Sequence, residues 1–124
     1  QDATTGVITA KTLQESWPAN LPAPLISSFS EKALGAAADQ APEFPRALLV
    51  WEFPADWQAR CEALGATGLH ASAKHLTEAQ ARGVLDAGYA LRVYTVNDPA
   101  QAAGLYAWGV ESLFSDYPER LSAP

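Results

Sequence analysis

Residues 90–99 read ALRVYTVNDP, and this stretch decides the fold class. Its first seven residues combine β-branched and aromatic side chains and predict a strand over 90–96. The NDP that follows supplies an acceptor for a helix cap at Asn97 and a proline for the first helical turn. A strand that leads directly into a helix is a βα unit, which is the repeating element of parallel sheets.

The same alternation continues on both sides of this stretch. Strands are expected over residues 24–29, 47–51, 68–71, 90–96 and 112–115. Helices are expected over residues 5–17, 31–40, 55–64, 78–88 and 99–109, followed by a short turn or helix over 116–121. Five βα units predict an α/β protein with a parallel sheet, preceded by one helix that has no strand before it.

Local signals mark several helix ends. Ser30 is expected to cap the helix over 31–40, and TEAQ at 77–80 is typical of a capping box. Gly65 and Gly88 stand where two of the helices would end. These signals predict boundaries from residues that are close together in the sequence.

The composition predicts one domain over residues 1–124, since 48% of its residues are hydrophobic and 18% are charged. A formal net charge of −6 disfavours nucleic acid and anionic membrane partners. No apolar run reaches the roughly 18 residues of a membrane helix. Cys61 is the single cysteine, which leaves no intramolecular disulfide and favours the cytoplasm over the periplasm as the compartment. Because methionine is absent and Gln1 comes first, we expect a processed chain or a piece of a longer one.

Functional groups of parallel βα proteins gather at the carboxyl ends of the strands. The polar and aromatic residues predicted at those ends are Phe29, Trp51, Glu52, His70, Ser72, Tyr94, Asn97, Ser115 and Asp116. They form no recognised catalytic motif, and His70 and His75 share no face that would favour a metal site. Neither GxGxxG nor GxxxxGK[ST] occurs, so nucleotide binding has no support.

Each of these candidates also has a plain structural interpretation. Tyr94 can be a pocket wall whose hydroxyl bonds to any convenient partner. Asn97 is expected to cap a helix rather than bind a ligand, and Asp116 is expected to cap the final turn. His70 is expected to be a hydrogen-bonded wall residue rather than a base.

Three strings in order resemble the glycerophosphodiester phosphodiesterase family, and its short bacterial members in particular: LISSFS at 25–30, YTVND at 94–98 and WGVESLFSDYP at 108–118. The similarity runs from Thr4 to Leu121. It implies a (β/α)8 TIM barrel, of which this chain would form strands 4–8, the C-terminal part; the whole fold has about 250 residues. The family's His-Arg-Gly, Glu-x-Asp, His-Asp and Glu-Ile-Lys motifs, which carry the catalytic histidines, the metal-binding carboxylates and a lysine, have no counterpart here.

The resemblance implies metal-assisted hydrolysis of glycerophosphodiesters to glycerol 3-phosphate and an alcohol. It places calcium or magnesium in the full-length parent and no catalytic or metal-binding residue in this chain. Phe29, Tyr94 and Asn97 match pocket positions of the family and are the expected substrate-binding residues. Tyr94 stands where many members have tryptophan.

Half a barrel has unpaired strand edges. We expect the missing N-terminal half of the barrel, or a second copy of the chain, to cover those edges, and the isolated chain to lack activity. Two alternatives remain open. One is a non-catalytic half-barrel module that binds a small phosphorylated ligand or a protein, and the other is an open, doubly wound sheet of the flavodoxin type.

Overall fold

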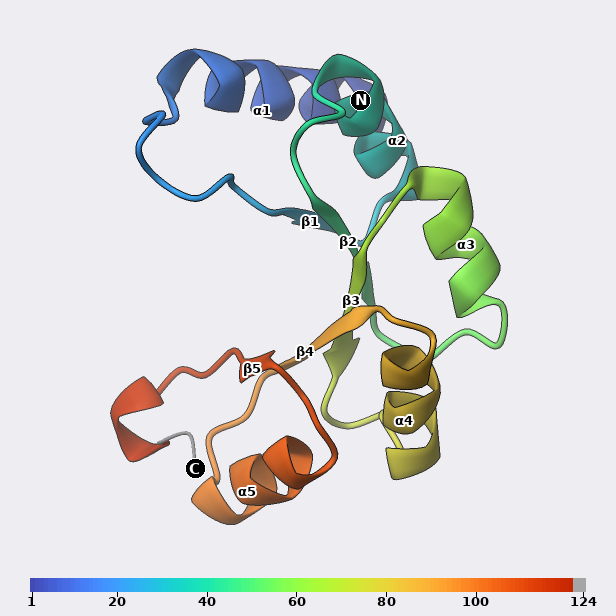
Figure 1. The fold of residues 1–124 in the computed structure, drawn as a ribbon, viewed down its shortest axis with the longest axis vertical. Helices are drawn as coiled ribbons and strands as arrows, with labels where there is room; N and C mark the ends of the chain where they lie inside the picture. Colours follow the sequence, from blue (N-terminus) through green and yellow to red (C-terminus); the bar gives the residue numbers. More distant parts are fainter. Residues whose placement is uncertain (122–124) are drawn as a thin grey trace. The chain divides into compact units, whose positions relative to one another are not determined.

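The computed structural model describes residues 1–121 and has an α/β fold with parallel strands (Figure 1). The strands are β1 (Ile26–Ser28), β2 (Arg46–Val50), β3 (Gly68–Ser72), β4 (Ala90–Tyr94) and β5 (Ser112–Leu113). The helices are α1 (Asp2–Ser16), α2 (Glu31–Gln40), α3 (Trp57–Leu64), α4 (Glu78–Asp86) and α5 (Pro99–Ala107), followed by the 3-10 helix η1 (Pro118–Arg120). The predicted alternation of strands and helices is confirmed.

Several predicted boundaries move by a few residues. The strand expected over 24–29 covers only Ile26–Ser28, and Pro24 at its expected start has no N–H to donate to a ladder. The strand expected over 90–96 ends at Tyr94, and the helix expected from residue 5 begins at Asp2. Strand and helix ends depend on hydrogen-bond partners elsewhere in the chain, which local patterns do not contain.

The chain divides into two compact units, and the first contains residues 1–49 and 58–67. In this unit β1 pairs in parallel with β2, with Ile26 opposite Arg46. Helices α1 and α2 lie side by side (Figure 1) and enclose a small apolar core. The buried residues of that core are Ala10, Ala37, Ala41 and Phe44. Most of them are alanines, which lets the two helices approach closely.

Gly6 permits the close approach of α1 to α2. It is buried in α1, and a Cβ atom at this position would overlap the carbonyl oxygen of Ala33 in α2. The absence of a side chain at Gly6 therefore determines how near the two helices come.

Arg46 is a buried cation that is satisfied by backbone carbonyl groups. Its Nη1 donates to the carbonyl of Phe44 at 2.8 Å and to that of Pro42 at 3.5 Å. Its Nε donates to Leu64 at 3.3 Å and its Nη2 to Gly65 at 3.2 Å. The last two acceptors stand at the end of α3, where the negative end of the helix dipole favours a cation. One side chain thus connects the start of β2 to the end of α3.

Cys61 lies on the inner side of α3 and has no exposed surface. Burial, together with the nearby carboxylates of Glu31 and Glu62, raises the pKa of its thiol to about 11. The side chain is therefore a protonated thiol at neutral pH and serves as a small apolar group in the packing of α3.

The second unit contains residues 50–57 and the chain from residue 68 onward. Its strands are ordered β3-β4-β5 and all pair in parallel. In β4, Leu91 and Val93 are fully buried, whereas Arg92 and Tyr94 alternate with them and are only half-buried. Because side chains of a strand point alternately to its two faces, Arg92 and Tyr94 share the face that carries polar groups.

Two of the predicted helix starts are confirmed by side-chain hydrogen bonds. Ser30 Oγ accepts the N–H of Ala33 at 3.1 Å and caps α2. Thr77 Oγ1 accepts the N–H of Gln80 at 3.2 Å, and Gln80 Oε1 accepts the N–H of Thr77 at 2.9 Å. The capping box at the start of α4 is therefore complete in both directions.

Replacing Arg46 with methionine should destabilise the first unit. The change leaves buried carbonyl groups without donors, so we expect the free energy of unfolding to fall by about 2 to 4 kcal/mol. Urea unfolding followed by circular dichroism measures the effect. The matched control is Arg60→Met, which removes an exposed ion pair with Glu31 and should cost less than about 1 kcal/mol. Equal losses for the two variants would contradict the structural role of Arg46.

A second pair of variants tests the contact between α1 and α2. Gly6→Ala should destabilise the protein by about 1 to 3 kcal/mol, because its methyl group meets the backbone of Ala33. Gly104→Ala in α5 meets nothing within 4 Å, so it should stabilise its helix by about 0.5 to 1 kcal/mol. Thermal unfolding should show a lower melting temperature for Gly6→Ala and a higher one for Gly104→Ala. A higher melting temperature for Gly6→Ala would contradict the close approach of α1 to α2.

Candidate functional site

A pocket of ≈190 Å³ lies at the carboxyl ends of β3 and β4 in the second unit. It is lined by Trp51, Ser72, Ala73, Lys74, Tyr94 and Thr95. Ser72 and Tyr94 are opposite each other in the parallel register, so the pairing of the two strands brings their side chains together. Functional groups of parallel βα proteins gather at this end of the strands.

Tyr94 forms one wall of the pocket. Its hydroxyl donates to the backbone carbonyl of Val50 at 2.5 Å, and burial raises the pKa of the phenol. The ring centroids of Tyr94 and Trp51 lie 6.5 Å apart. This hydrogen bond holds the tyrosine ring beside Trp51, which agrees with the interpretation of Tyr94 as a pocket wall.

The turn after β3 is held by three hydrogen bonds. Ser72 Oγ accepts the N–H of Lys74 at 3.2 Å, and the carbonyl of Ser72 accepts the N–H of His75 at 3.1 Å. The N–H of Ala73 donates to the carbonyl of Tyr94 at 2.7 Å, which fastens the turn to β4. These hydrogen bonds therefore hold the backbone of residues 72–75 in one conformation.

This turn places two polar side chains against Trp51. The Nζ atom of Lys74 lies 5.9 Å from the centroid of the Trp51 ring, within cation–π range. The His75 ring meets the same indole in a T-shaped contact with centroids 5.0 Å apart. A positive charge thus stands at the mouth of an aromatic pocket.

Asn97 connects the loop after β4 to the segment after β5. Its Oδ1 accepts from Ser115 Oγ at 2.9 Å and from the N–H of Asp116 at 3.0 Å. Its Nδ2 donates to the carboxylate of Asp116 at 3.3 Å. The prediction that Asn97 caps the next helix is wrong, because Asp98 accepts the N–H of Ala100 and is the cap of α5.

Asp116 also differs from its predicted role as a cap. The N-cap position of η1 is Tyr117, with no side-chain cap hydrogen bond. The N–H of Tyr117 instead donates to Ser115 Oγ at 3.0 Å. The carboxylate of Asp116 bonds to Asn97, so both expected caps serve to join two loops.

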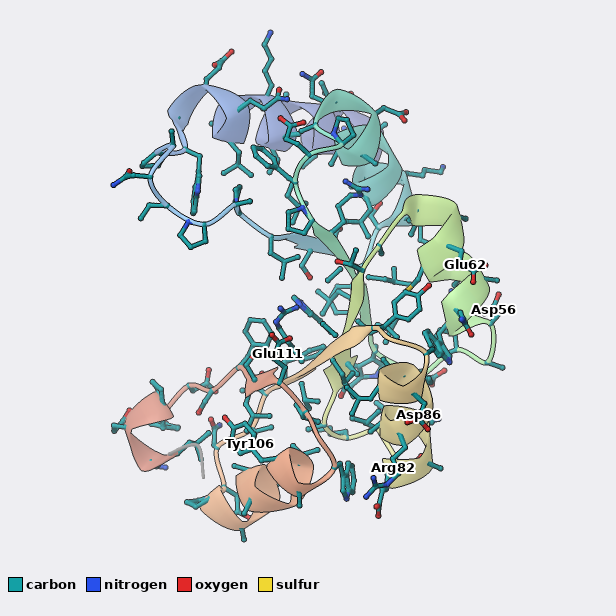
Figure 2. The ribbon with its side chains drawn as sticks, viewed as in Figure 1. Asp56, Glu62, Arg82, Asp86, Tyr106 and Glu111 are labelled. Carbon is teal, nitrogen blue, oxygen red and sulfur yellow. The ribbon has the colours of Figure 1, made fainter. Side chains whose placement is uncertain are left out.

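His70 is a buried imidazole between a cation and an aromatic ring. Its Nε2 lies 3.5 Å from Nη1 of Arg92, which can only donate, and its ring centroid lies 5.2 Å from that of Phe114. Burial, followed by the charge of Arg92, lowers the pKa of His70 from 6.5 to about 4. Arg92 also pairs with Glu111 at 3.1 Å (Glu111 is labelled in Figure 2). His70 is therefore neutral at pH 7 and packs against Phe114 and Arg92, and it is not among the residues that line the pocket.

Phe29 belongs to the first unit and follows β1 directly. Its side chain is 57% exposed. Ser28 Oγ accepts the N–H of Ser30, which turns the chain from β1 into α2 immediately after Phe29. Of the three predicted substrate-binding residues, the structure places Tyr94 and Asn97 in the second unit, and Phe29 is described only within the first.

Within residues 1–121, no group of three or more His, Cys, Asp or Glu side chains gathers closely enough to hold a metal ion. None of the helices in this part of the chain has the length and apolar character to cross a bilayer.

Lys74 was missed by sequence reasoning, although Trp51 and Ser72 were among the residues predicted at strand ends. The strand was expected to end at Ala71, one residue before its observed end at Ser72. The Ser72 hydroxyl bond to the backbone of Lys74 is a local signal that could have found the turn. The contact of Lys74 with Trp51 joins residues 23 positions apart in sequence, and no local pattern reports it.

Comparison with known proteins gives a consistent result. A family model described as the glycerophosphoryl diester phosphodiesterase family matches residues 6–120. A solved phosphodiesterase from Oleispira antarctica, in complex with the product sn-glycerol-3-phosphate, is 35% identical with a TM-score of 0.90. A glycerophosphodiester phosphodiesterase from Parabacteroides distasonis is 22% identical with a TM-score of 0.76. No curated protein matches the chain.

The aligned regions cover 96% and 95% of this chain but 48% of each of these two solved chains. The chain therefore spans about half the length of the solved relatives that it matches.

The lowered pKa of His70 predicts a pH-dependent stability. The unfolded chain takes up a proton near pH 6.5, whereas the folded chain does so near pH 4, so the contribution is full above 6.5 and is lost as the pH falls towards 4. Between pH 7 and pH 5 we expect a loss of about 1 to 2 kcal/mol from this group. Urea unfolding at both pH values measures it. His70→Gln should remove this part of the pH dependence, and an unchanged pH dependence in the variant would contradict it.

Proposed function

The chain belongs to the glycerophosphoryl diester phosphodiesterase family, and from this premise we propose that its parent hydrolyses glycerophosphodiesters to glycerol 3-phosphate and an alcohol. The observation that carries the proposal is the 35% identity over 96% of this chain with a phosphodiesterase solved with sn-glycerol-3-phosphate. The pocket at the carboxyl ends of β3 and β4 agrees with it, because barrel enzymes bind their substrates at that end.

We propose that the chain is the C-terminal part of a (β/α)8 barrel and contributes its strands 4–8 as a single domain. The parallel strands in sequence order and the coverage of about half of each relative support this assignment. The rest of the barrel would then pair with the strand edges that this chain leaves open. A second copy of the chain is the other partner that could cover them.

The substrate-binding residues that we propose are Phe29, Tyr94 and Asn97. Tyr94 is supported by its place in the pocket wall, and Phe29 by an exposed aromatic ring directly after β1. Both polar ends of the Asn97 amide bond to the segment after β5. Asn97 is therefore proposed to contribute to substrate binding through the segment after β5, where it holds Ser115 and Asp116 in place.

The groups that break the phosphodiester bond are proposed to lie outside this chain. The part of the chain that the structure describes offers no cluster of metal ligands, and its one buried histidine is neutral. Calcium or magnesium is accordingly proposed to bind to the remainder of the parent enzyme. We place that enzyme in the cytoplasm, since a lone cysteine fits a reducing compartment.

Complementation of the barrel tests this function. The chain is mixed with the half of the Oleispira antarctica enzyme that it does not cover, and glycerophosphocholine hydrolysis is measured with calcium or with magnesium. We expect activity from the mixture and none from either half alone. In the mixture, Tyr94→Ala should raise KM by about tenfold, because the aromatic wall is lost.

The matched control is Tyr106→Ala, which changes a tyrosine on α5 outside the pocket (Figure 2) and should leave KM unchanged. Turnover by this chain alone would contradict the assignment of the catalytic groups to the other half. Inactivity of a mixture that forms a stable complex would contradict the proposed function.

A further inference from the structure

The pocket at the ends of β3 and β4 combines aromatic walls with one positive charge. Trp51 and Tyr94 supply the rings, and Lys74 is its only charged lining residue in the part of the chain described. Sites that bind a quaternary ammonium group surround the cation with aromatic faces. Here one of those faces is already occupied, because Lys74 Nζ lies over the Trp51 ring.

The backbone of Lys74 is held in place by hydrogen bonds within the turn and to β4. Its backbone N–H bonds to Ser72 Oγ, and the adjacent Ala73 is fastened to β4 through the carbonyl of Tyr94. Ser72 itself is 2% exposed and therefore has little freedom to move. The turn thus fixes the point from which the lysine side chain reaches the Trp51 ring.

We propose that Lys74 selects the alcohol of the substrate: it favours glycerophosphodiesters with a neutral polyol head group and disfavours those with a quaternary ammonium. This inference rests on the proposed function, and it names a substrate class for the same pocket. Two unit charges about 6 Å apart in water repel each other enough to weaken binding about threefold. A choline head group against Trp51 would meet this repulsion, whereas glycerol or inositol would not.

A polyol also suits the other lining groups. Lys74 offers three N–H donors, and Ser72 and Thr95 contribute hydroxyl groups to the lining. The ring of Trp51, which is 49% exposed, provides an apolar surface for the C–H groups of the polyol. Lys74, Ser72, Thr95 and Trp51 thus each offer a group that suits a neutral polyol, and none of the six lining residues is a carboxylate that would attract an ammonium group.

Binding to the isotope-labelled full chain tests the proposal by NMR. Glycerophosphoglycerol and glycerophosphocholine are titrated separately, and Kd is taken from the indole N–H signal of Trp51, assigned with Trp51→Phe. We expect the polyol diester to bind more tightly in the wild type. In Lys74→Gln, the Kd for glycerophosphocholine divided by the Kd for glycerophosphoglycerol should fall about threefold.

Two further variants control for general effects of charge. Lys74→Arg keeps the cation and should keep the ratio. Lys32→Gln removes the same charge from α2, outside the pocket lining, and should also keep it. An unchanged ratio in Lys74→Gln, tighter binding of choline by the wild type, or no response of Trp51 to either diester would overturn the proposal.

Hydrolysis of both diesters by each variant, mixed with the complementary barrel half, separates this inference from the proposed function. An unchanged Kd ratio with hydrolysis overturns the role of Lys74 and leaves the phosphodiesterase function standing. A ratio that shifts as expected, without hydrolysis by mixtures that form a stable complex, supports the selection by Lys74 and contradicts the phosphodiesterase function.

Discussion

The backbone hydrogen bonds between β3 and β4 determine what the second unit can do. Their parallel register sets His70 opposite Arg92 and Ser72 opposite Tyr94, so the imidazole lies near a guanidinium and Ser72 and Tyr94 line one pocket. A slip of one residue in either strand would move its pair of side chains to the opposite face of the sheet, away from the pair on the other strand. The place of Ser72 and Tyr94 in the pocket lining, the charge of Arg92 beside the buried His70 and the bond from Ala73 to the carbonyl of Tyr94 all depend on this register.

Features with short-range causes were predictable from the sequence. The alternation of strands and helices and the capping box at 77–80 needed only neighbouring residues. Asn97 and Asp98 illustrate the limit, because both can cap a helix and only a distant partner decides between them. That partner is the segment from Ser115, which takes the amide of Asn97 and leaves Asp98 to cap α5. Lys74 shows the same limit, since its contact with Trp51 depends on tertiary structure.

The two arginines on strands are stabilised in different ways. Arg46 is buried and bonds to backbone carbonyls alone among its described partners, so its charge is balanced by dipoles. Arg92 is half-buried and lies between the imidazole of His70 and the carboxylate of Glu111. The first arrangement connects two elements of the fold, and the second adds a positive charge to the burial that lowers the pKa of His70.

The buried thiol of Cys61 is a natural probe for local opening of the first unit. Because the group has no exposed surface and a pKa of about 11, a thiol reagent at neutral pH finds almost no thiolate in the native state. Modification then requires the first unit to open, so the labelling rate counts openings around α3 without an introduced probe. Since this is the sole cysteine of the sequence, the signal comes from a single position.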